Sequence, residues 1–166
     1  MFILLIGPKG SGKTHIGRVL QDAWDVHFFP VERYWKAYHE ECVRQGREQA
    51  IQDGISIVHP EIGRALRRHR HVCVETTGAS LEILNSLLSL QDAAPILVRV
   101  QAPFEICLER IRRRDPEDQI PIRDELIAEI YQRSQAIDLA FDLELDNSTS
   151  LTDRQILDAF TPLITD

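Results

Sequence analysis

The chain has 166 residues, of which 43% are hydrophobic and 27% charged, and these values are typical of a globular protein built as one domain. Its formal net charge of −7 disfavours general binding to nucleic acid or to an anionic membrane, because both require a basic protein surface. The three cysteines, Cys42, Cys73 and Cys107, are odd in number and lack the spacing of metal ligands, so we expect reduced, mostly buried thiols in a cytoplasmic protein. No apolar stretch approaches the length of a membrane span.

Short apolar runs that predict strands recur along the chain. Phe2–Ile6 is continuous and apolar, as expected of a strand buried on both faces, and Val26–Phe29 is a weaker candidate. Residues 72–74 and 96–100 resemble the first run. Apolar and acidic residues alternate over 141–146, which predicts a strand with one exposed face.

The segments between these runs have the period of an amphipathic helix, with apolar residues at positions i, i+3 and i+4. Such patterns cover residues 16–24, 81–88, 104–111, 126–137 and 156–164. The stretch 32–70 is helical in character without a clear division. Strands that alternate with helices predict an α/β protein in which a parallel sheet is covered on both faces.

The segment after the first predicted strand carries a phosphate-binding pattern. Glycines in such a loop let backbone N–H groups surround phosphate oxygens, and the helix that follows adds its own unpaired N–H groups. Lys13 would reach the β- and γ-phosphates, and the Thr14 hydroxyl would ligate Mg²⁺. The pattern therefore predicts that ATP and Mg²⁺ bind at this loop. The segment reads Gly7-Pro8-Lys9-Gly10-Ser11-Gly12-Lys13-Thr14 and fits G-x-x-x-x-G-K-[ST] in full.

A glycine-rich turn without a ligand is the alternative interpretation of this segment. A chance match to the full pattern, placed between a predicted strand and a predicted helix, is rare because glycine is only about 7% of residues in an average protein. Nucleotide binding is therefore favoured. Catalysis does not follow from the loop alone, since nucleotide-binding switches contain the same pattern.

The loop, the small size and the order of the later motifs resemble the P-loop kinases of small molecules. This group includes shikimate kinases, nucleoside monophosphate kinases and relatives often described as AAA-type ATPases. The resemblance covers nearly the whole chain. It implies a three-layer P-loop fold with a five-stranded parallel sheet in the order 2-3-1-4-5, a lid over residues 110–123, and a small-molecule phosphoryl acceptor.

The predicted lid begins with an arginine-rich helix end, which comprises residues 110–114. Guanidinium groups there would neutralise charge on the transferring phosphoryl group. By resemblance, Arg110 packs against the nucleotide base and Arg114 reaches the phosphates, with Arg112 and Arg113 as substitutes. A solvated basic end that suits the helix dipole is the alternative. The polar segment 115–121 carries two prolines and predicts a mobile loop.

Two carboxylates are candidates for the catalytic site. Glu75 follows the apolar run at 72–74, where P-loop enzymes often hold Mg²⁺, so it is a candidate metal ligand and catalytic residue. Glu32 follows the second predicted strand, where related kinases carry an aspartate that serves as base or substrate anchor. A carboxylate there could accept the proton of a substrate hydroxyl. A capped turn after Glu75 and an exposed helix-start position for Glu32 are the alternatives.

The chain departs from shikimate kinases at two places. No aspartate stands near Glu32, and residues 76–80, Thr-Thr-Gly-Ala-Ser, replace a run of glycines that contacts substrate in that branch. Shikimate kinase activity itself is therefore not expected. Asn147, after the last predicted strand, lies in the loop that backs the adenine ring in this family, although it is also a common turn residue. Four aromatic side chains could line a pocket, although packing in the core or an interface is favoured: Trp24, Tyr34, Trp35 and Tyr38.

These observations favour an ATP-dependent kinase of a small molecule, in which Lys13 and the lid arginines act on the phosphates and Glu32 or Glu75 orients the acceptor. The second hypothesis is a regulatory or partner-linked ATP-binding protein with slow hydrolysis. A remodelling NTPase is disfavoured by the small size and the acidity of the chain. The segment 33–61 is expected to define the acceptor.

Overall fold

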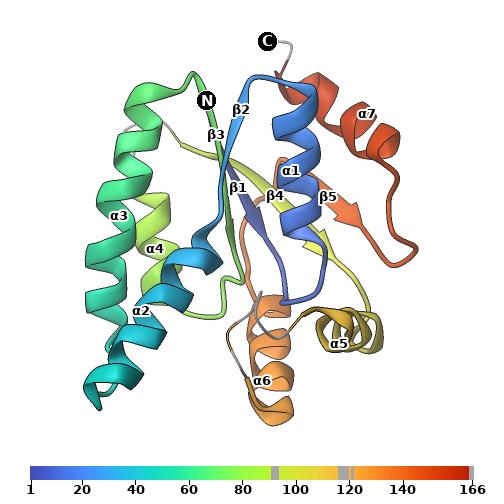
Figure 1. The fold of residues 1–166 in the computed structure, drawn as a ribbon. Coiled ribbons are helices and arrows are strands. Elements are labelled where there is room, and N and C mark those ends of the chain that lie inside the picture. Colours follow the sequence, from blue (N-terminus) through green and yellow to red (C-terminus); the bar gives the residue numbers. More distant parts are fainter. Residues whose placement is uncertain (91–93, 116–119, 121, 165–166) are drawn as a thin grey trace.

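The computed structural model describes residues 1–90, 94–115, 120 and 122–164, which form an α/β fold around a five-stranded parallel sheet (Figure 1). The strand order β2-β3-β1-β4-β5 confirms the order implied by the resemblance. The strands are β1 (Phe2–Ile6), β2 (Val26–Phe29), β3 (His71–Thr76), β4 (Ile96–Gln101) and β5 (Leu143–Asp146). The helices are α1 (Lys13–Ala23), α2 (Val31–Gln45), α3 (Ile51–Arg68), α4 (Leu81–Leu88), α5 (Phe104–Arg113), α6 (Asp124–Gln135) and α7 (Asp153–Ile164).

Side chains that alternate along the strands build a separate core on each face of the sheet. In β1, Ile3 and Leu5 pack with α1 and α7, whereas Leu4 and Ile6 pack with α3 and α4. These two pairs of helices cover opposite faces of the sheet (Figure 1). All four side chains are at most 1% exposed. The coverage of both faces predicted from the continuous apolar run is therefore confirmed.

The structure divides the stretch 32–70, which the sequence pattern left undivided, into α2 and α3. Helix α2 ends at Gly46, whose φ of 63° is left-handed and whose N–H bonds back to the last turn. The predicted strand at 72–74 is longer, and Glu75 lies inside β3 opposite Leu5 of β1. Most of the predicted mobile loop, residues 116–119 and 121, lies outside the described residues.

The carboxyl ends of β1 and β3 bring the candidate site together. Ile6 is in register with Thr76, and the N–H of Gly7 donates to the carbonyl oxygen of Thr76 at 3.2 Å. The chain segments that leave these two strands therefore begin side by side. Ligands of parallel α/β sheets bind at this edge.

Two expectations from composition can be compared with the fold. None of the helices in the described ranges is both long and apolar enough to cross a membrane. Cys42, Cys73 and Cys107 are buried and form no disulfide, as predicted.

Phe160 tests the core between α7 and the sheet. Its side chain is fully buried, and we expect Phe160→Ala to lower the free energy of unfolding by about 3–5 kcal/mol because apolar contact is lost and a cavity remains. Urea denaturation measures this change. Leu81→Ala, at a side chain that is 70% exposed, is the control and should stay within about 0.5 kcal/mol. Equal effects of the two variants would contradict the assignment of the core.

Candidate functional site

The loop between β1 and α1 is shaped by two glycines at positions where a side chain does not fit. Gly10 has a φ of 84°, and a Cβ there would lie 2.4 Å from the carbonyl oxygen of Cys107. Gly12 has a φ of 103°, and a Cβ there would lie 2.1 Å from Nδ2 of Asn147. Helix α1 then begins without a side-chain cap and without an acidic residue in its first turn. This geometry suits an anion at the N-terminus of α1.

Hydrogen bonds from Asn147 fix the position of this loop. Its Nδ2 donates to the carbonyl oxygen of Ser11 at 2.7 Å, and its Oδ1 accepts from the N–H of Leu151 at 2.7 Å. Its own N–H donates to the carbonyl oxygen of Gln101 at the end of β4. The side chain is 5% exposed. Asn147 therefore ties the phosphate loop to β4 and to the segment before α7.

Arg110 makes a second connection between the same parts. Its guanidinium group donates to the carbonyl oxygens of Gly10 at 3.4 Å and Asn147 at 2.8 Å, and to Oγ of Ser150 at 2.9 Å. The N–H donors of a guanidinium lie in its plane, so these bonds orient the group and leave its faces available for stacking.

Beneath the loop, Lys13 is 7% exposed and donates to the carbonyl oxygens of Gly7 at 2.7 Å and Pro8 at 2.8 Å. Burial lowers the pKa of Lys13 to about 8, against the opposing effect of Glu75 and Glu32. The ammonium group is therefore shielded from water and lies against the loop that is predicted to bind phosphate.

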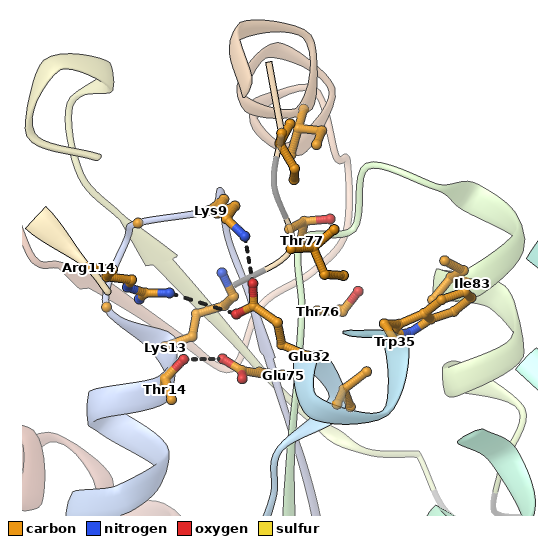
Figure 2. A pocket seen from close by; sticks show the side chains of 16 residues that line it. Lys9, Lys13, Thr14, Glu32, Trp35, Glu75, Thr76, Thr77, Ile83 and Arg114 are labelled. Carbon is orange, nitrogen blue, oxygen red and sulfur yellow. Dashed lines mark hydrogen bonds and ion pairs between the residues drawn. The ribbon is translucent and has the colours of Figure 1, made fainter. Parts of the chain in front are cut away.

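Thr14 and Glu75 place a hydroxyl oxygen and a carboxylate oxygen, both possible metal ligands, beside Lys13 (Figure 2). The Thr14 hydroxyl donates to Oε2 of Glu75 at 2.9 Å. Burial raises the pKa of the Glu75 carboxyl, and this effect is partly offset by the Lys13 ammonium and by the bond from Thr14. The structure thus brings the two predicted metal ligands together.

Glu32, at the start of α2, lies between two cations from other parts of the chain. Lys9 Nζ of the phosphate loop is 2.5 Å from its Oε1, and Arg114 Nη1 at the end of α5 is 3.7 Å from its Oε2 (Figure 2). The Glu32 side chain is 30% exposed. The carboxylate therefore joins the loop, α2 and the end of α5 by charge.

A pocket of about 230 Å³ opens over these groups. All four side chains that the sequence predicted as catalytic, Lys13, Glu32, Glu75 and Arg114, line it. Arg110 and Asn147 are not among its described lining residues, because they approach the phosphate loop from β4, β5 and α5.

The arginines at the end of α5 take different directions. Arg112 pairs with Asp124 at 2.7 Å, and Arg113 pairs with Glu109 at 2.5 Å, and both arginine side chains are exposed. Of the arginines at 112–114, it is Arg114 that lines the pocket, whereas Arg112 and Arg113 are not among its described lining residues.

Trp35 and Ile83 also line the pocket; a pocket position was the less favoured alternative for Trp35, and Ile83 was not predicted. The expectation that Trp35 packs in the core is only partly correct, since its ring contacts the core of the α3–α4 face and also borders the pocket. The sequence carried a signal for Trp35, because it follows Val31 by one helical turn and Val31 borders the same pocket. Ile83 comes from α4 and had no such signal.

Asn147 provides a test of how the loop is held. We expect Asn147→Ala to lower the free energy of unfolding by about 1–3 kcal/mol, because the Ser11 carbonyl and the Leu151 N–H lose a buried partner. Nucleotide affinity should fall as well, and urea denaturation and titration calorimetry measure the two effects. Asn147→Asp should be at least as unstable, since it turns a carboxylate toward the Ser11 carbonyl. Asn85→Ala, at an exposed asparagine, is the matched control; a similar effect there would contradict this role.

The pKa of Lys13 predicts a pH dependence of ATP binding without a metal ion. In the free protein the pKa is about 8, and bound phosphates would raise it because they favour the ammonium form. Binding then takes up a proton, so affinity should be level near pH 7 and fall by up to about tenfold per pH unit above about pH 8. Titration calorimetry with EDTA measures this profile. Lys13→Met should bind weakly with no such fall, and a level profile in the parent protein up to about pH 10 would contradict the prediction.

Comparison with known proteins agrees with this architecture. Residues 2–137 match a family model described as AAA domain. A curated relative, the cell division cycle protein 48 homolog of Archaeoglobus fulgidus, is 29% identical over 168 residues. This alignment covers 90% of the present chain but only 22% of the relative, so the chain spans a small part of that protein.

Solved structures of kinases share the fold at low sequence identity. A sugar kinase from Janibacter sp. has a TM-score of 0.67 at 16% identity, with 98% of this chain and 93% of that chain covered. Shikimate kinase from Aquifex aeolicus has a TM-score of 0.60 at 20% identity, with 99% and 96% covered. Because the family model matches most of the chain, the protein belongs to the AAA domain family, and it has the fold of the P-loop small-molecule kinases.

Proposed function

We propose that this protein is an ATP-dependent kinase that transfers the γ-phosphoryl group to a hydroxyl group of a small molecule. The observation that carries the proposal is the position of Glu32. Its carboxylate lies between the cations around the phosphate loop and the part of the pocket that extends toward Trp35 and Ile83 (Figure 2). A hydroxyl group bound in that part could give its proton to Glu32 while its oxygen faces the phosphates.

The nucleotide is proposed to lie along the phosphate loop, in contact with residues 7–14. Its phosphates would accept from the N–H groups of the loop and of the first turn of α1. Lys13 would exchange the carbonyl oxygens of Gly7 and Pro8 for phosphate oxygens, which are better partners for an ammonium group. The base would stack on the oriented guanidinium of Arg110, beside the loop of Asn147.

The residues present fit Mg²⁺. Thr14 and Glu75 supply a hydroxyl and a carboxylate oxygen, which are the donors that this ion prefers, and they already meet at 2.9 Å. Mg²⁺ binds through few protein ligands when phosphates complete its coordination, so two suffice. When bound there, the ion would neutralise charge on the phosphate oxygens.

In the proposed transfer, the acceptor oxygen forms a bond to the γ-phosphorus as the bond from that phosphorus to the bridging oxygen of ADP breaks. The acceptor proton passes to Glu32. Lys9 and Arg114 would leave their ion pairs with Glu32 when the phosphates bind, before this proton transfer, and would move to the phosphoryl oxygens. Their charges would stabilise the transition state by position, which is how P-loop enzymes gain most of their rate.

A second candidate function is a regulatory ATP-binding protein with slow hydrolysis. The ion pairs of Glu32 favour it, because Lys9 and Arg114 each engage one oxygen of the carboxylate and an acceptor hydroxyl would have to displace one of them. In this alternative, nucleotide binding would move Lys9 and Arg114 without transfer to an acceptor.

We further propose that residues 1–166 form a single P-loop kinase-like domain with its lid around 110–123, and that the protein works in the cytoplasm on a small molecule and not on nucleic acid. The acidic net charge and the three buried, unpaired cysteines support this assignment.

Replacement of Glu32 tests the proposed kinase. ADP release from ATP and Mg²⁺ is measured with alcohols, sugars, hydroxy acids and nucleosides as acceptors, and Lys13→Ala serves as the blank. With an acceptor that raises turnover, Glu32→Gln should lower kcat about 10²–10⁴-fold, because the proton acceptor is lost. The KM for ATP should stay level or fall, since glutamine no longer competes with phosphate for Lys9 and Arg114.

Glu40→Gln is the matched control, because Glu40 lies on the same helix with its side chain 59% exposed, and its kcat should equal that of the parent protein. Turnover that no acceptor raises, while ATP still binds, would reject the kinase in favour of the regulatory alternative. A full rate in Glu32→Gln would leave Glu32 without a role in proton transfer.

A further inference from the structure

The pocket over the phosphate loop has two chemically different ends. Its charged lining residues are Lys9, Lys13, Glu32, Glu75 and Arg114, and they gather at the loop. The other, apolar end is formed by the indole ring of Trp35 and by Ile83 (Figure 2), and the remaining apolar lining side chains come from α2, α6 and the segment before α6. The apolar lining residues are Val31, Trp35, Ile83, Ile120, Ile122 and Ile130.

Trp35 is held in place at this end by its packing between α2 and α3. A Cβ on Gly54 of α3 would lie 2.0 Å from Cζ3 of the indole, so only glycine lets the ring lie this close to the α3 backbone. Tyr38 meets the same ring edge-on, with the ring centroids 6.1 Å apart. The indole therefore presents a fixed apolar surface to the pocket and not a mobile one.

The polar groups between the two ends are few. Thr76 Oγ1 accepts from the N–H of Gly78 at 3.1 Å, and Thr77 Oγ1 accepts from the N–H of Ala79 at 3.3 Å. A threonine hydroxyl that accepts one bond still has its own hydrogen to donate. These two hydroxyl groups can donate hydrogen bonds to one or two oxygen atoms of a ligand near Glu32. They are too few to satisfy a polyhydroxylated molecule such as a sugar.

An acceptor with its own negative charge does not suit the apolar end. A carboxylate or phosphate placed against Trp35 and Ile83 would be desolvated with none of the described lining side chains there carrying a positive charge. The unbonded hydroxyl groups of a sugar would be unfavourable for the same reason. A second hollow adjoins this pocket, shares Thr14, Glu32, Glu75 and Arg114 with it, and is otherwise lined mainly by cationic side chains. An anionic acceptor would bind on that side of Glu32, against Arg18, Arg33 and Lys36.

We infer that the phosphoryl acceptor is a neutral alcohol with a mainly hydrocarbon, ring-containing body. This inference rests on the proposed kinase function. The ring lies against Trp35 and Ile83, and the hydroxyl group lies beside Glu32 within reach of Thr76 or Thr77. Its oxygen bonds to the γ-phosphorus, the bond to ADP breaks, and its proton passes to Glu32.

The test uses acceptors that share a ring but differ in charge. 1-Phenylethane-1,2-diol and mandelate differ only in a hydroxymethyl group and a carboxylate, and glycerol, ribose and adenosine complete the set. In a Trp24→Phe background Trp35 is the remaining tryptophan, so its fluorescence reports binding without the need for turnover. We expect the neutral ring alcohol to change Trp35 emission and to give a kcat/KM at least about tenfold above that of mandelate or the sugars.

Trp35→Ala separates the acceptor site from the ATP site. It should raise the KM for the ring alcohol about 10–100-fold and leave the KM for ATP unchanged, because the indole borders only the acceptor end. Arg33→Ala, in the second hollow, tests the anionic alternative and should leave the KM for the ring alcohol unchanged. Arg44→Ala, at a side chain on the same helix that is 73% exposed, is the matched control and should change neither value.

The outcomes distinguish this inference from the proposed function. The inference of a neutral ring alcohol would be overturned if turnover were fastest with mandelate, a sugar or adenosine. It would also be overturned if turnover fell in Arg33→Ala and not in Trp35→Ala. Either result would leave the proposed kinase function standing. A Trp35 signal with the ring alcohol but no turnover with any acceptor would overturn the kinase and retain a binding site for such alcohols. The absence of both signals would overturn the inference.

Discussion

The burial of a single ammonium group, that of Lys13, is the constraint on which the site depends. A lysine that is 7% exposed must find partners within the protein, because an unpaired charge is unfavourable away from water. The carbonyl oxygens of Gly7 and Pro8 provide them, and the Glu75 and Glu32 carboxylates oppose the lowering of its pKa. The loop curves around this one side chain, and its glycines permit the curvature.

The loop keeps this shape because other elements hold it. Asn147 and Arg110 connect it to β4, to the segment before α7 and to α5. The bond from Asn147 to Ser11 is buried and those of Arg110 are partly buried or exposed, and together they restrict the movement of the loop. The N-terminus of α1 has no side-chain cap, so its first N–H groups are free to bind an anion, and the loop before it is held in position.

Glu32 connects this rigid base to the more variable side of the pocket. It belongs to α2, yet its ion pairs are with the phosphate loop and with the end of α5. Any ligand that draws Lys9 or Arg114 toward phosphate must also release Glu32. Phosphate binding and the freeing of a proton acceptor are therefore coupled through two contacts, and the apolar surface of Trp35 begins one helical turn further along the same helix.

The sequence alone determined the α/β class, the strands and the phosphate loop, because continuous apolar runs, helical periodicity and the glycine pattern are local properties. Its resemblance to P-loop kinases supplied the strand order that the structure confirms. Only the tertiary structure decided that Arg114 lines the pocket while Arg112 and Arg113 face outward. Arg112 and Arg113 belong to the last turn of α5, whereas Arg114 is its C-cap residue with an extended backbone, and the sequence pattern does not tell at which arginine the helix ends. The apolar end of the pocket also depended on packing, because Trp35 and Ile83 come from helices far apart in the chain and meet only when both cover the same face of the sheet.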